Sequence, residues 1–194
     1  KVAEIYSSYE KKLILANAMD FDDLLLKTVD LLNTNETVLK KWSKKFQFIM
    51  VDEYQDTNHV QYKLVELLAS DNKNICVVGD SDQSIYAFRG ANIRNILEFE
   101  KDFNNAKIIQ LDKNYRSTKK ILNLANSIIS NNDRKIEKNL WTDNEDGLDI
   151  SSIKFRSEKD EAKWVAEEIR NIISQDQSAE VAIFYRTNSQ SRLF

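Results

Sequence analysis

The sequence has little of what disulfide frameworks, cysteine–histidine metal sites and membrane anchors require. Its 194 residues include one cysteine, one histidine, three glycines and no proline. One cysteine and one histidine cannot build a disulfide or a Cys/His metal centre, and we expect Cys76, which lies in an apolar run, to be a buried, inert thiol. No apolar run approaches the ~20 residues that cross a bilayer, and no signal peptide is visible. An intracellular protein with no membrane contact is therefore expected.

An excess of charge of one sign is also absent. The 28 basic and 31 acidic residues leave a formal net charge of −3. This balance gives no electrostatic sign of nucleic-acid binding, so any such binding would have to depend on local geometry and base stacking. The hydrophobic share of 42% and the charged share of 30% are ordinary for a soluble globular protein.

Hydrophobic periodicity predicts an α/β architecture after a helical start. Residues 1–46 show helical spacing, with Asp20 as the N-cap of a helix. Helical patterns then alternate with apolar runs of strand length at 46–51, 74–80, 106–112, 150–155 and 180–187. A helix near 92–101 and another that Ser157 caps belong to this alternation. Continuous apolar strands between helices are typical of a parallel sheet that is covered on both faces.

Acidic residues directly follow the first predicted strand. Asp52 and Glu53 come straight after "FQFIMV", and Asp56 follows after two further residues. Ligands of open parallel sheets bind beyond the carboxyl ends of the strands, where these carboxylates would lie. Neighbouring residues point in different directions, so one carboxylate could face a hydrated Mg²⁺ while the other polarises a water. The alternative is that the acids only cap the next helix.

A second polar loop, "VVGDSDQSIYAFRGA", follows the second predicted strand. We expect Gly79 to permit a tight turn and Gln83 to orient a water or a phosphate oxygen. Tyr86 and Phe88 alternate with an alanine, so their rings could lie on one side and stack on bases without reading sequence. The alternative is a buried aromatic pair.

The third predicted strand ends in "DKNYRST", in which Arg116 directly precedes the strongest helical pattern of the chain. A planar guanidinium suits the charge that develops on a transferring phosphoryl group. The alternative is an ordinary surface salt bridge.

Together these motifs resemble the UvrD/PcrA/Rep group of superfamily 1 DNA helicases, and the PcrA/UvrD type most closely. The resemblance also extends to "MDFDDLLLKTVDLL", "KNLWTDNEDG" and "VAIFYRTNSQSR", so it covers nearly the whole chain. It implies RecA-like P-loop NTPase sheets flanked by helices. Residues 1–46 would end a helical insertion, 47–112 would form the later part of the first motor domain, and 113–194 would begin the second.

The resemblance implies ATP and Mg²⁺ as cofactors and a role for each site residue. Asp52 would hold Mg²⁺, Glu53 would be the general base, and Gln83 would sense the γ-phosphate. Tyr115 would stack on adenine, and Arg116 would act as an arginine finger.

The DNA contacts are implied in the same way. Tyr86 and Phe88 would contact single-stranded DNA, with Phe88 standing where the family usually carries tryptophan, and Arg89 would couple the two sites. Arg186 and Asn188 are further candidates for DNA contacts. The implied partners are single-stranded DNA and single/double-strand junctions, the implied polarity is 3′ to 5′, and the implied setting is DNA repair or replication in the bacterial cytoplasm, at the nucleoid.

The phosphate-binding loop of the family, G-x-x-x-x-G-K-[ST], is not found in the sequence. Gly79, Gly90 and Gly147 are the only glycines, and none of them fits the motif. We therefore expect a fragment of a longer protein, and a fragment without activity of its own. A helicase-like interaction or structural module without catalysis is the alternative, against which the intact "DEYQD" and "NYRST" argue.

Overall fold

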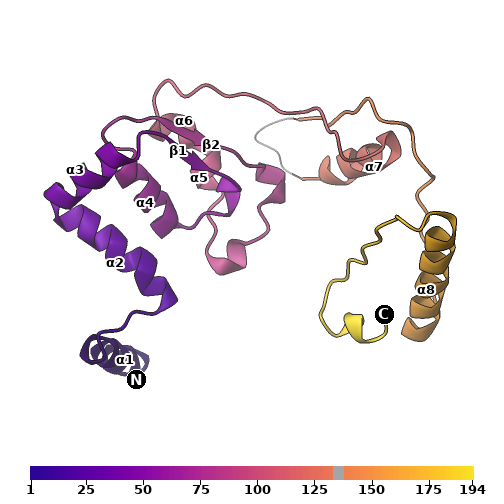
Figure 1. The fold of residues 1–194 in the computed structure, drawn as a ribbon, viewed down its shortest axis with the longest axis horizontal. Helices are drawn as coiled ribbons and strands as arrows, with labels where there is room; N and C mark the ends of the chain where they lie inside the picture. The colour runs from indigo at the N-terminus through magenta and orange to yellow at the C-terminus, as the bar shows by residue number, and fades with distance from the viewer. Residues whose placement is uncertain (133–137) are drawn as a thin grey trace. The chain divides into compact units, whose positions relative to one another are not determined.

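The computed structural model describes residues 1–132 and 138–194. These residues form two compact units, Lys1–Glu145 and Asp146–Phe194, and Figure 1 shows the course of the chain through each of them. No helix in the described part of the chain is long and apolar enough to cross a membrane.

The first unit begins with the helices α1 (Val2–Leu15), α2 (Phe21–Thr34) and α3 (Glu36–Lys45). Asp20 begins α2, because its carboxylate accepts the Asp23 N–H at 2.9 Å. The α2 helix packs against α3 and α4, and its Val29 and Leu32 are buried. The predicted helical start and the predicted Asp20 cap are therefore confirmed.

Two parallel strands follow, β1 (Ile49–Val51) and β2 (Ile75–Val77), and α4 (His59–Leu68) connects them. Ile49 lies opposite Ile75 and Val51 opposite Val77. Because the strands are parallel, their carboxyl ends lie at the same edge of the sheet. The loops that leave β1 and β2 therefore start side by side, which positions the candidate site.

The remaining elements of the first unit are short, except for α7. They are η1 (Tyr54–Asp56), η2 (Ser81–Gln83), η3 (Ala87–Arg89), α5 (Arg94–Leu97), α6 (Phe99–Asp102) and α7 (Lys119–Ile129). The single helix predicted near 92–101 is in fact two helices, because the backbone of Glu98 leaves the helical region (φ −113°, ψ 9°).

The second unit contains α8 (Glu158–Gln175) and the short η4 (Gln190–Arg192). Ser157 caps α8 as predicted, since its hydroxyl accepts the Asp160 N–H at 3.2 Å. Phe155 packs on Trp164 of α8, with 5.8 Å between the ring centroids.

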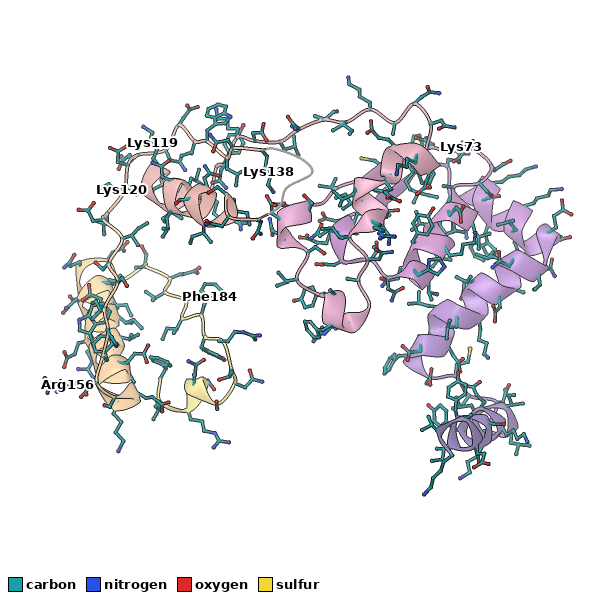
Figure 2. The ribbon with its side chains drawn as sticks, turned by 180° about the vertical axis from the view of Figure 1, so that it is seen from behind. Lys73, Lys119, Lys120, Lys138, Arg156 and Phe184 are labelled. Atoms are coloured by element: carbon teal, nitrogen blue, oxygen red, sulfur yellow. The ribbon has the colours of Figure 1, made fainter. Side chains whose placement is uncertain are left out.

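Three of the five predicted strands do not form. Segments 106–112, 150–155 and 180–187 have no regular strand structure. Most of their apolar side chains are exposed, and Phe184, labelled in Figure 2, is exposed to 94%. A strand requires a neighbour for its backbone hydrogen bonds, and these segments pair with no strand among the described residues. The expectation of a sheet covered on both faces is also wrong for this chain, because Met50 is 80% exposed and Cys76 is exposed rather than buried.

Candidate functional site

Asp52 and Glu53 lie at the carboxyl end of β1, with their side chains exposed. Glu53 has a left-handed backbone (φ 50°, ψ 42°), which costs a residue other than glycine about 1–2 kcal/mol. Its N–H donates to Asp52 Oδ1 at 2.9 Å. Backbone strain of this kind is concentrated at functional sites, where the surrounding structure enforces it.

Buried side chains directly after Glu53 hold this turn in place. Tyr54 is fully buried, and its ring meets Phe99 edge to face at 5.7 Å. Burial, with a smaller effect of two nearby carboxylates, raises the pKa of Tyr54 to about 12. The Asn95 amide donates at 3.1 Å both to the carbonyl and to the hydroxyl of Thr57. Packing and hydrogen bonds of the residues after Glu53 therefore hold the turn that carries Asp52 and Glu53.

Gln55 joins the loops that follow β1 and β2. Its Nε2 donates to Glu53 Oε2 at 2.8 Å, and its Oε1 accepts the Asp80 N–H at 2.9 Å. Sequence reasoning missed Gln55, because an amide between two acids carries no sign of a contact 25 residues away.

Gln83 is tied to the same loop through Asp80. Gln83 Nε2 donates to Asp80 Oδ2 at 2.8 Å, and Lys138 (Figure 2) contacts Asp80 and, at 3.2 Å, Asp82. Burial raises the pKa of Asp80, but the hydrogen bonds from Lys138, Gln83 and the Asp82 N–H together lower it by more, so the pKa lies below its usual value. Asp80 is therefore an ionised acceptor that orients Gln83, and neither Asp80 nor Lys138 was predicted as a site residue.

Gly79 is needed for a close approach rather than for an unusual turn. A Cβ on Gly79 would lie 2.5 Å from Gln55 Oε1 and 3.1 Å from the Tyr54 nitrogen. Its φ is not positive, in contrast to that of Gly90 at 88°. The predicted tight turn is therefore not what requires glycine at position 79; the close approach of Gln55 and Tyr54 is.

Tyr86, Phe88 and Arg89 form an exposed aromatic and cationic cluster. The two rings lie 6.0 Å apart, and the Arg89 Cζ lies 5.2 Å from the Tyr86 centroid and 5.6 Å from that of Phe88. Phe88 is 78% exposed, so the alternative of a buried aromatic pair is wrong for this chain. Exposed rings beside a guanidinium can stack on bases and attract the backbone of a nucleic acid.

Tyr115 and Arg116 lie in a turn that leads into α7. The Asn114 side chain accepts the N–H groups of Arg116 and Ser117, at 2.9 and 2.7 Å. Tyr115 and Arg116 are both exposed, and Arg116 forms no salt bridge with any residue that the structure describes. No described contact brings either residue to Glu53 or Gln83, so the structure does not join these parts of the predicted nucleotide site.

Arg186 and Asn188 are exposed in the second unit, in a turn that Gln190 closes. The Gln190 side chain accepts the N–H groups of Arg186 and Thr187 at 2.9 Å each, and Ser191 Oγ donates to the Asn188 carbonyl at 2.7 Å. Both side chains remain available for a ligand.

The residues present fit a magnesium ion that is bound partly by a protein carboxylate and partly by the phosphates of a substrate. Within the described ranges, no group of three or more His, Cys, Asp and Glu side chains could hold a metal. Mg²⁺, however, is usually bound by one or two carboxylates together with substrate phosphates. The exposed Asp52 uses Oδ1 for the Glu53 N–H, which leaves Oδ2 for such an ion.

Comparison with known proteins assigns the chain to a class. Residues 1–104 match the UvrD/REP helicase N-terminal domain, and residues 109–194 match the UvrD-like helicase C-terminal domain. The chain therefore belongs to the UvrD/REP helicase family. It is 50% identical over 194 residues to the ATP-dependent DNA helicase PcrA of Bacillus subtilis (strain 168). It is 52% identical over 196 residues to the ATP-dependent DNA helicase PcrA of Staphylococcus aureus (strain Mu50 / ATCC 700699).

These matches cover 99% of this chain and 26% of each relative, so the chain spans about a quarter of the length of the curated relatives it matches. The predicted family is confirmed, and the parallel strands with their helices agree with a fragment of a RecA-like α/β fold. The domain boundaries at 46 and 112, and the roles of the individual site residues, stay predictions.

Proposed function

We propose that this chain is part of an ATP-dependent DNA helicase that moves 3′ to 5′ along single-stranded DNA and unwinds duplexes. One observation supports this proposal above the others. The loop after β2 contacts Gln55, the hydrogen-bond partner of Glu53, at its start, and it carries the exposed Tyr86–Phe88–Arg89 cluster at its end. One short segment thus touches both a carboxylate site and a surface suited to bases, which is what coupling of ATP hydrolysis to DNA requires.

In this proposal the nucleotide site uses Glu53 as the general base for the attacking water and Asp52 as a ligand of Mg²⁺. Bound Mg²⁺ would neutralise the charge on the phosphates of ATP. Gln83 senses the γ-phosphate with its exposed amide, and Tyr115 stacks on adenine. Arg116 supplies positive charge to the transferring phosphoryl group. It is available for this role because it forms no salt bridge with any residue that the structure describes.

The DNA site uses Tyr86 and Phe88 as stacking platforms and Arg89 as the link between the two sites. Arg186 and Asn188 add contacts to the strand. Stacking tolerates any base, which suits movement along single-stranded DNA and binding at single/double-strand junctions. We place the protein in the bacterial cytoplasm, at the nucleoid, in DNA repair or replication.

We expect ATP hydrolysis from the full-length protein and none above background from the isolated 194-residue chain. These residues contain no phosphate-binding loop, whose N–H groups and lysine would hold the phosphates. The measurement is ATP turnover of both proteins with Mg²⁺, with and without single-stranded DNA, and with a chelator as the control. DNA-stimulated turnover by the isolated chain would contradict the expectation. A full-length protein without turnover would instead favour the non-catalytic module.

A further inference from the structure

We propose that Gln55 is a positioning residue, which fixes the Glu53 carboxylate and holds it in register with the loop that carries Gln83. This inference rests on the proposed function, because it assigns Gln55 a part in ATP hydrolysis through Glu53. Gln55 itself would touch neither ATP nor the attacking water.

The chemistry of the two partners requires an amide at this position. A carboxylate such as that of Glu53 can only accept a hydrogen bond, and the Asp80 N–H can only donate one. The Gln55 amide does both, since Nε2 donates to Glu53 Oε2 at 2.8 Å and Oε1 accepts from Asp80 at 2.9 Å. A glutamate in its place would keep the acceptor and lose the donor, and a methionine would lose both.

Gln55 has no room to turn away from these partners. It is 1% exposed, and the Ser84 hydroxyl donates to its backbone carbonyl at 3.3 Å. The missing side chain of Gly79 leaves the space that Oε1 occupies, because a Cβ there would lie 2.5 Å from this oxygen. The amide is thus fixed from both the β1 and the β2 loop.

Because Gln55 is fixed, it gives the Glu53 carboxylate a defined position, which an exposed side chain would otherwise lack. An exposed glutamate rotates freely, whereas a general base must stay within hydrogen-bond reach of its water. Beyond the amide, the carboxylate of Asp80 accepts from Gln83 at 2.8 Å. A movement of Gln83 would therefore be transmitted to Glu53 through Asp80 and Gln55. The general base is thus aligned only when the loop after β2 has the position described here.

Two variants of the full-length protein test the proposal, Gln55→Met and Gln55→Glu. With saturating single-stranded DNA, both are expected to lower kcat about tenfold, because a misplaced base near the reacting atoms loses much of its effect. The KM for ATP is expected to stay within about twofold of the original value, because Gln55 does not contact the nucleotide. If one variant fails to fold, the other decides the result.

A double variant separates positioning from a merely structural role. If Gln55 acts through Glu53, adding Gln55→Met to Glu53→Gln removes nothing further, and single-turnover hydrolysis equals that of Glu53→Gln alone. The matched control is Gln61→Glu. Gln61 accepts the Asn58 N–H at 2.9 Å in the capping box of α4, where glutamate serves equally well, so kcat is expected to be unchanged.

The outcomes distinguish this proposal from the proposed function. An original full-length protein without DNA-stimulated ATP turnover would overturn the proposed function, and this inference with it. Normal turnover in the original protein, with normal kcat in both Gln55 variants, would overturn the positioning role alone. The positioning role would also be overturned if adding Gln55→Met to Glu53→Gln lowered the hydrolysis rate by the same factor as Gln55→Met lowers it in the original protein.

Discussion

Changing Glu53 to glutamine in the full-length protein is expected to lower DNA-stimulated ATP turnover by about 10²- to 10⁴-fold. A positioned general base contributes about this much to a rate, and an amide has the shape of the carboxylate without its basicity. ATP binding is expected to persist, because Asp52, Tyr115 and Arg116 are unchanged. The measurement is steady-state kcat together with the Kd of a fluorescent ATP analogue.

The contacts of Glu53 show why this variant should fold. A glutamine at position 53 can still accept a hydrogen bond from the Gln55 amide through its own Oε1, so this hydrogen bond is kept. The matched control is Glu36→Gln on α3, where an exposed glutamate pairs with Lys40 at 2.6 Å. That control should hydrolyse ATP normally. An unchanged turnover number in Glu53→Gln would remove Glu53 from the mechanism.

Replacing Phe88 by alanine is expected to weaken single-stranded DNA binding by about 1–3 kcal/mol, or about 5- to 150-fold in Kd. The effect should depend little on base sequence, because every base offers a face for stacking. The melting temperature should fall only slightly, since the ring is largely exposed. Phe88→Trp should bind DNA more tightly at unchanged stability, because it offers a larger stacking face. DNA affinity and melting temperature are measured on the same samples at one stated salt concentration.

A buried phenylalanine in the same unit is the control for Phe88. Phe103 is buried and stacks on Phe99 with 4.7 Å between centroids, so Phe103→Ala should cost about 3–5 kcal/mol of folding stability. DNA affinity in its folded fraction should be normal. If Phe88→Ala behaved in this way instead, the stacking role would be wrong.

Most local features of the fold were predictable from the sequence, and most non-local ones were not. Helix caps such as Asp20 and Ser157 depend on residues three positions away, and both are confirmed. The strands β1 and β2 form because each pairs with the backbone of the other. Segment 180–187 has an equally apolar pattern, but such a pattern does not supply a pairing strand, and Phe184 remains exposed.

The same distinction holds at the candidate site. The carboxylates at the end of β1 were predicted from the rule that ligands bind beyond parallel strands. Gln55 and Lys138 were missed because both contact Asp80, which lies 25 and 58 residues from them in the sequence. Phe88 illustrates another limit of sequence patterns. The alternation of Tyr86 and Phe88 with an alanine predicted that the two rings share a side, but it could not decide whether they are buried or exposed.

The most direct test of the central claim is strand separation by the full-length protein with ATP and Mg²⁺. Two duplexes of equal length are compared, one with a 3′ single-stranded tail and one with a 5′ tail, and displacement of a labelled strand is followed over time. We predict ATP-dependent separation of the 3′-tailed duplex, and none without ATP or with Glu53→Gln. ATP turnover without separation of either duplex, or separation of the 5′-tailed duplex alone, would contradict the account.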